Sequence, residues 1–196
     1  MAISLRADAP RDGAKVIGKA VRDLGLFGSD DPLAGGAALD LSKPIPIYRL
    51  KLDDLREYGV ASLDKAEMVG WRYLLETEGG GEVSYVDLHE RNNDTRFSSI
   101  ARNPNAAALL EAAGLAERAA KPLEGDCELR AIEVPAAKVA ALWIVHATAS
   151  FVPYIDGAAG APIRGKQLSP QDFFAELNKR LPEADERAPG RDLMSR

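Results

Sequence analysis

Between Val139 and Ile155 the sequence contains no Asp, Glu, Lys or Arg, and this run limits the folds open to the chain. Its first part, Val139 to Val145, is apolar at every position, so both faces of this element must be covered. A membrane-spanning helix needs about 20 mostly apolar residues, whereas this run is shorter and is interrupted by polar residues and a proline. We therefore predict a strand over 139–146 in the interior of a sheet, then an irregular segment, and no membrane association.

A period of two residues predicts further strands. Apolar and polar residues alternate over 47–53, and apolar residues occupy every second position over 69–75. The segments 83–88 and 127–134 are predicted as further strands. The second and third of these segments flank a turn that contains Gly79-Gly80-Gly81. Two strand patterns around a short glycine-rich turn predict a β-hairpin.

Apolar residues recur at helical spacing in three segments, 13–26, 106–120 and 170–181. Asn103-Pro104 predicts the start of the second helix, because Asn caps helices and Pro is tolerated in the first turn. Gly114 is expected to end that helix or to divide it. Ser169 precedes the third in a capping-box pattern, and this helix is expected to stop at Pro182. Glycines and prolines over 28–44 predict a loop.

In chain order these segments give helix, strand, hairpin, helix, strand, strand and helix. Grouped strands with few helices between them favour an α+β fold over a doubly wound parallel sheet. We predict a mainly antiparallel sheet of about five strands packed with two or three helices. A single domain would span 13–183, after a loose segment at 1–12 and before a disordered tail at 184–196.

The charge and the cysteine content limit which partners and which cell compartment are expected. The chain has 196 residues, 25 Lys and Arg against 30 Asp and Glu, and a net charge of −5. An acidic protein offers no overall attraction for nucleic acid, so no nucleic-acid partner is expected. The single cysteine, Cys127, excludes an internal disulfide and a cysteine-rich metal site, which fits a reducing cytoplasm. We expect no cofactor and assign no metal.

Asp87 and His89 are the first candidates for chemistry. They stand two residues apart at the end of a predicted strand, so both side chains project from one face of the sheet. Such a pair is able to bind a metal, or Asp87 can orient His89 as a general base. A metal site needs three or more ligands, and His146, with Asp126 or Glu128, is the candidate to join them in space, although nothing in the sequence requires it. The alternative is a polar strand end that runs into a solvated loop, which is the commoner origin of this pattern.

The segment Gly160-Ala-Pro-Ile-Arg-Gly165-Lys166-Gln167 matches the phosphate-binding loop G-x-x-x-x-G-K-[ST] except at its last position. In that loop, backbone N–H groups and the lysine hold phosphates, and a hydroxyl holds Mg²⁺. Gln167 has no hydroxyl, and the predicted helix begins only at Pro170. Gly160, Gly165 and Lys166 are therefore candidates for a phosphate site, and a surface loop is the favoured interpretation.

No catalytic residue is assigned from these patterns. Six large aromatic residues lie on or beside the predicted sheet: Trp71, Tyr73, Tyr85, Trp143, Phe151 and Tyr154. They predict an ordinary core or, if several share an uncovered face, an interaction surface or an apolar pocket. The leading hypothesis is a soluble, non-enzymatic domain that binds a protein partner or forms a homo-oligomer. The alternative is a small-molecule-binding or metal-binding enzyme domain whose pocket uses Asp87, His89 and His146.

Overall fold

One mixed β-sheet organises the computed structural model, which describes residues 9–23, 40–41, 43–76, 83–91, 94–102, 104–157 and 161–182. Its strands are β1 (Asp40–Leu41), β2 (Ile45–Arg49), β3 (Glu67–Glu76), β4 (Val83–Arg91), β5 (Asp94–Ala101), β6 (Glu128–Val134), β7 (Val139–Val145) and β8 (Ser150–Asp156). Seven of them follow the order β5-β4-β3-β2-β6-β7-β8, and β1 pairs with β3. Neighbours are antiparallel except β2 and β6, which run parallel at the centre of the sheet.

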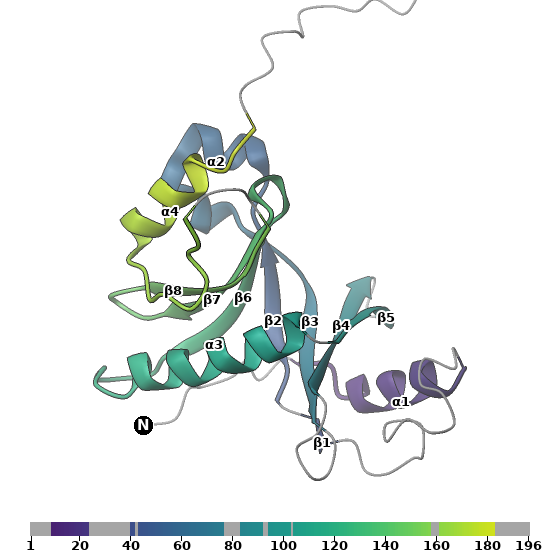
Figure 1. Cartoon of the computed structure of the whole chain (residues 1–196). Helices are drawn as coiled ribbons and strands as arrows, with labels where there is room; N and C mark the ends of the chain where they lie inside the picture. Colours follow the sequence, from purple (N-terminus) through teal and green to yellow (C-terminus); the bar gives the residue numbers. More distant parts are fainter. Residues whose placement is uncertain are drawn as a thin grey trace, which may run out of the picture.

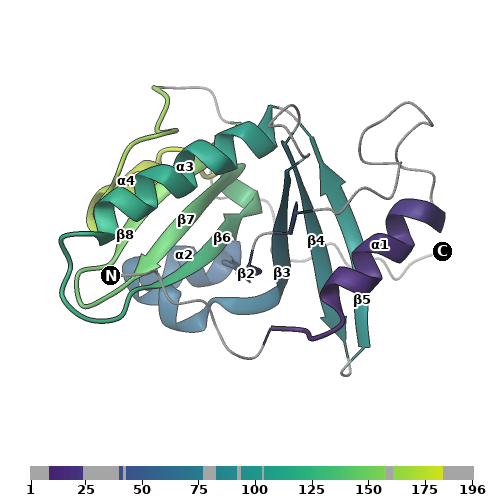
Figure 2. The same ribbon diagram turned by 90° about the horizontal axis from the view of Figure 1, so that it is seen from below.

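Helices cover both faces of this sheet. They are α1 (Gly13–Asp23), α2 (Leu52–Tyr58), α3 (Asn105–Ala120) and α4 (Pro170–Asn178), with 3₁₀ turns η1 (Gly59–Lys65) and η2 (Pro135–Ala137). The helix α3 crosses one face diagonally (Figure 1) and packs on Leu74, Tyr85 and Leu142. On the other face, α1 packs on β3 and β4, while α2 and α4 pack on β6 to β8. Figure 2 shows α3 and α1 on opposite sides of the strands.

The predicted α+β class is confirmed, whereas its details need correction. Within the described residues the sheet has eight strands rather than about five, and four α-helices pack on it rather than two or three. The hairpin is confirmed as the antiparallel pair β3–β4, although its glycine turn lies outside the described residues. The capping function of Ser169 is also confirmed, since its Oγ accepts a hydrogen bond from the Asp172 backbone N–H at 3.1 Å.

Two predicted boundaries are wrong, for different reasons. The strand predicted over 47–53 ends at Arg49, and the helix α2 begins at Leu52. Asp53 and Asp54 stand in the first turn of α2, where acidic side chains interact favourably with the helix dipole. The alanine-rich helix α3 continues past Gly114 to Ala120, because the packing of its alanines outweighs the low helix propensity of one glycine.

Three strands were not predicted. Residues 150–156, expected to be irregular, form β8, whose Pro153 is tolerated because β8 is the last strand in the order of the sheet. The strand β5 went unnoticed because an irregularity in its pairing interrupts the period of two residues. Asp40 and Leu41, inside the predicted loop 28–44, pair with β3 as β1.

The remaining predictions fall partly outside the described residues. These are the loose segment 1–12 in most of its length, the tail 184–196, the capping residue Asn103, and the end of the helix predicted over 13–26. The helix predicted to stop at Pro182 ends earlier, at Asn178. None of the described helices is both long enough and apolar enough to cross a membrane.

Candidate functional site

A cluster of charged side chains lies on the face of the sheet that α3 partly covers. Arg72 of β3 and Asp87 of β4 are directly opposite each other in the antiparallel register. Glu133 of β6 reaches the same place because β2 and β6 run parallel, with Arg49 opposite Glu133. These charges share their face with the apolar residues beneath α3, such as Leu74 and Ala131. The sheet therefore brings charges from four strands to one position.

Arg72 is the centre of this cluster, and only 2% of it is exposed. Its Nε and Nη2 atoms donate to the two carboxylate oxygens of Asp87, each at 2.7 Å, in a bidentate pair. Nη2 also donates to Glu133 Oε1 at 2.9 Å. Because a buried charge without partners is very unfavourable, these contacts hold Arg72 ionised inside the fold.

Two tyrosines complete the surroundings of Arg72. Its guanidinium carbon lies 4.1 Å from the centre of the Tyr85 ring, and Nη1 donates to the Tyr154 hydroxyl. Burial by itself lowers the pKa of Arg72, but Tyr154, Asp87 and Tyr85 oppose it, and the pKa is raised overall. Burial raises the pKa of Tyr154, and the nearby Arg72 only partly offsets this.

The raised pKa of Tyr154 predicts a loss of stability in alkaline solution. Above about pH 10 the tyrosine ionises in the unfolded chain but stays protonated in the folded protein. The folded state then binds more protons than the unfolded state, so a rise in pH favours unfolding. The free energy of unfolding should fall by up to about 1.4 kcal/mol per pH unit for this group. Urea unfolding from about pH 8 to about pH 11 measures this slope.

Tyr154→Phe serves as the comparison for that measurement. Burial raises the pKa values of Tyr73 and Tyr85 as well, so the variant should keep part of the slope. The variant is expected to start less stable at neutral pH, because it lacks the hydroxyl that accepts from Arg72. An equal slope in the variant and the natural protein would show that Tyr154 is not the group responsible.

A pocket of about 300 Å³ opens beside this cluster. Its lining comes from five neighbouring strands: Ile47, Arg49, Val69, Asp87, Leu88, His89, Ser98, Ser99 and Glu133. Asp87 and Glu133 keep 13% and 21% of their side chains exposed, although both bind the buried Arg72. Two carboxylates that a buried cation holds in place thus remain accessible from the pocket.

Irregular pairing at two positions shapes the pocket. In the β2–β3 register Ile47 faces Gly70 and Tyr48 faces Met68, so Val69 has no residue opposite it. In the β4–β5 register Ser98 is likewise left without one. Both residues line the pocket. Bulges of this kind redirect side chains and are frequent beside functional sites.

The structure brings two of the three residues of the predicted pocket together. Asp87 and His89 line it jointly, and His89 Nδ1 donates to the Val69 carbonyl oxygen at 2.6 Å. With the proton on Nδ1, neutral His89 has Nε2 as a hydrogen-bond acceptor. His146 follows β7, which three strands separate from β4, and its Nε2 donates to the Glu124 carbonyl oxygen at 2.8 Å. His146 therefore does not belong to this pocket.

A metal centre finds no support in the part of the chain that the structure describes. Within it, no group of three or more His, Cys, Asp or Glu side chains is arranged to hold a metal ion. Cys127 is buried in the core beneath α3.

Sequence reasoning missed Arg72 and Glu133. The available signal was the single charge in the run Gly70 to Leu75, which is otherwise uncharged. A charge inside a buried strand has to be paired, so Arg72 implied acidic partners on neighbouring strands. Which strands these were depends on the long-range pairing of β2 with β6, which local patterns do not contain.

The candidate phosphate loop connects β8 to α4. Gly160 lies outside the described residues, and Gly165 has a positive φ of 73°. The Gly165 and Lys166 N–H groups donate to the carbonyl oxygens of Pro153 and Ile163. Internal acceptors thus already engage these N–H groups, and α4 begins four residues after Lys166, at Pro170.

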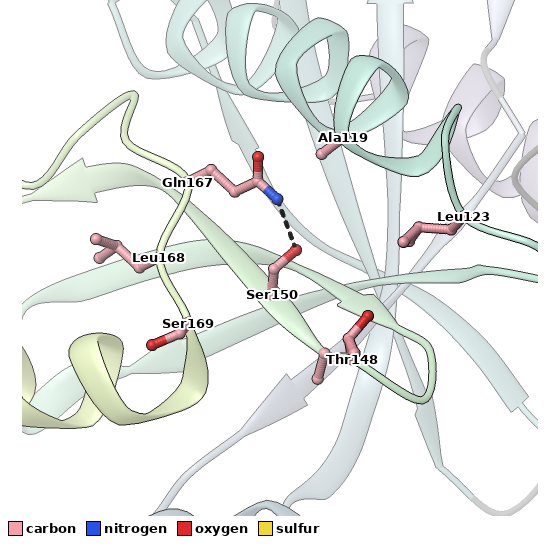
Figure 3. Close-up of a pocket in the computed structure, with 8 residues that line it drawn as sticks. Ala119, Leu123, Thr148, Ser150, Gln167, Leu168 and Ser169 are labelled. Carbon is pink, nitrogen blue, oxygen red and sulfur yellow. Dashed lines mark hydrogen bonds between the residues drawn. The ribbon is translucent and has the colours of Figure 1, made fainter.

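A second pocket, of about 280 Å³, lies between the end of α3, the β7–β8 turn and the segment before α4. Figure 3 shows Gln167 and Ser150 pointing toward each other across it, with Gln167 Nε2 at 3.4 Å from Ser150 Oγ. Its lining residues carry no formal charge: Ala119, Leu123, Thr148, Ala149, Ser150, Gln167, Leu168 and Ser169. This pocket therefore lacks the fixed ionic groups of the first.

The six aromatic residues of the predicted sheet are all buried, so they form core rather than an exposed surface. Among the described residues, Tyr58, Val60 and Leu110 are large apolar residues that are exposed. Comparison of the chain with family models, with curated proteins and with solved structures finds no match.

Proposed function

We propose that the protein binds a small polar molecule in the pocket beside Arg72. The observation that carries this proposal is the pair of carboxylates, Asp87 and Glu133, that the buried Arg72 holds while both still face the pocket. Burial of three charges costs free energy that an apolar cluster of the same volume would not. Fixed polar groups at the edge of an apolar floor are typical of ligand sites.

The chemistry of the lining supports a polar ligand. Ile47 and Val69 supply apolar contact, whereas His89 and Ser98 add hydrogen-bonding groups. This proposal keeps Asp87 and His89 from the pocket expected from the sequence and replaces His146 by Arg72 and Glu133. We assign no reaction to the site.

Filling the pocket tests the proposal. Ser98 is exposed, lines the pocket and lies outside the Arg72 ion cluster, so Ser98→Trp should block the site and leave the cluster in place. Thermal unfolding is measured with amino acids, polyamines, dicarboxylates and monosaccharides as probes. A ligand at about 100 times its Kd should raise the free energy of unfolding of the natural protein by about 2.7 kcal/mol. It should leave that of Ser98→Trp unchanged.

Thr148→Trp is the matched control, since it places the same side chain in the second pocket. It should retain the ligand-induced shift in full. Native mass spectrometry of the protein from its own host adds a search for a resident ligand as extra mass. The proposal fails if no probe or resident molecule binds, or if Ser98→Trp binds as well as Thr148→Trp.

A protein partner is the second function we propose, and β5 is the observation that favours it. Within the described residues β5 is the last strand at its edge, and no described strand pairs with its outer side. Unpaired backbone groups of an edge strand readily accept a strand from another protein. Native mass spectrometry should then show a hetero-complex. A homo-oligomer would identify a second copy as the partner, and a bare monomer at all concentrations would contradict both.

A further inference from the structure

Unused hydrogen-bonding capacity beside Arg72 indicates which ligand group would bind there. An ionised carboxylate accepts about four hydrogen bonds. Asp87 accepts three in the structure, from Arg72 Nε, Arg72 Nη2 and Ser99 Oγ. Glu133 accepts two, from Arg72 Nη2 and Arg49 Nη2. About three acceptor positions remain on the two groups together, which equals the number of donors on an ammonium group.

The two carboxylates also lie close enough to act on one group. Arg72 Nη2 is 2.7 Å from Asp87 Oδ2 and 2.9 Å from Glu133 Oε1, so one nitrogen joins both side chains. Arg72 fixes their positions, since its guanidinium is buried and bound on Nε, Nη1 and Nη2. A ligand ammonium would thus meet acceptors that are already in position.

Arg49 offers the opposite charge at the rim of the same pocket. About half of its side chain is exposed, and its Nη2 donates to Glu133 Oε2 at 2.9 Å. Exposed ion pairs of this kind contribute little to stability, so Arg49 can turn to a ligand at small cost. A guanidinium matches a carboxylate in a bidentate pair.

The charge balance of the site favours a ligand without net charge, and the free acceptor positions and Arg49 favour one that carries both groups. Two arginines and two carboxylates leave the Arg49, Arg72, Asp87 and Glu133 cluster with no net charge. A ligand with only a positive or only a negative group would bring an uncompensated charge into a partly buried pocket. A ligand that carries both signs keeps the site neutral.

We propose that the pocket binds a zwitterion of the α-amino acid type, an inference that rests on the ligand-binding function proposed above. The ligand ammonium donates to Asp87 and Glu133, and its carboxylate accepts from Arg49. The ligand side chain then lies along the apolar floor made by Ile47 and Val69.

Isothermal titration of the natural protein with each standard amino acid, its methyl ester and its N-acetyl derivative tests this assignment. The ester lacks the carboxylate and the N-acetyl compound lacks the ammonium. At least one free amino acid should bind, and each derivative should bind about tenfold more weakly or worse, because a charged hydrogen-bonding group is lost. Ser98→Trp should abolish binding of the free amino acid.

Arg49→Gln separates the two ends of the ligand. It should weaken binding of the free amino acid about tenfold and leave the affinity for the ester unchanged. Thermal unfolding of this variant should remain close to that of the natural protein, since Arg49 is half exposed. The zwitterion proposal is contradicted if the free amino acid and its methyl ester bind with equal affinity, or if no amino acid binds. If other probes still bind and Ser98→Trp blocks their binding, the proposed ligand-binding function holds although the zwitterion assignment fails.

Discussion

Replacing Arg72 by Met should lower the free energy of unfolding by about 3 kcal/mol. Asp87 and Glu133 would lose the cation that binds both of them, and each carboxylate is too far buried to be fully hydrated. Removal of one partner from a buried ion pair costs about 3–5 kcal/mol, and the partial exposure of these carboxylates places this case at the lower end. Urea unfolding near neutral pH measures the difference.

Arg96→Met is the matched control for this prediction. Arg96 also lies on a strand and also pairs with an aspartate, Asp94, but 76% of its side chain is exposed. Its replacement should change the free energy of unfolding by no more than about 0.5 kcal/mol. Similar losses in the two variants would mean that burial does not set the energy of the Arg72 cluster.

A double variant separates the structural role of the cluster from its role in binding. Arg72→Met with Asp87→Leu replaces the bidentate pair by apolar side chains, and such replacements often restore the stability that a single substitution loses. The ligand would find neither the oriented carboxylate nor the buried cation. We therefore expect the double variant to recover stability over Arg72→Met and still fail to bind the ligand of the natural protein.

Local patterns predicted the parts of the fold that local physics decides. The β3–β4 hairpin and the Ser169 cap depend on residues close together in the sequence, and both are confirmed. The strands β5 and β8 were missed because Ser98 breaks the period in one and Pro153 breaks it in the other. A register shift leaves Ser98 without an opposite residue in β5, and a shift beside Pro153 does the same for Tyr154 in β8. A register is a property of two strands rather than one.

The candidate site was predictable only within a single strand. Asp87 and His89 line one pocket, as their spacing on β4 indicated. His146 was placed with them by chemistry alone, and the strand order sets it apart. Glu133 meets Arg72 because the chain crosses over through α3 and returns as β6 beside β2. This meeting depends on the parallel pair, which no repeat in the sequence marks.

The close approach of β3 and β4 makes Gly70→Ala the second substitution with a large expected effect. A Cβ atom at Gly70 would lie 2.1 Å from the Leu88 carbonyl oxygen and 3.2 Å from the carbonyl carbon. These are backbone atoms of the neighbouring strand, so relief requires the two strands to separate locally. We expect a loss of about 3 kcal/mol in the free energy of unfolding, at the upper end of the cost of overpacking.

Gly114→Ala provides the control with the opposite sign. The nearest atom to its Cβ position is Arg118 Nη1 at 3.8 Å, so the methyl group has room, and alanine favours a helix by about 1 kcal/mol over glycine. Gly114→Ala should therefore stabilise the protein, whereas Gly70→Ala should destabilise it and shift the resonances of His89, which binds the neighbouring Val69 carbonyl oxygen. If both alanine variants raise stability, β3 and β4 do not approach as closely as the register requires. The pocket between Val69 and His89 would then lack the geometry on which its ligand depends.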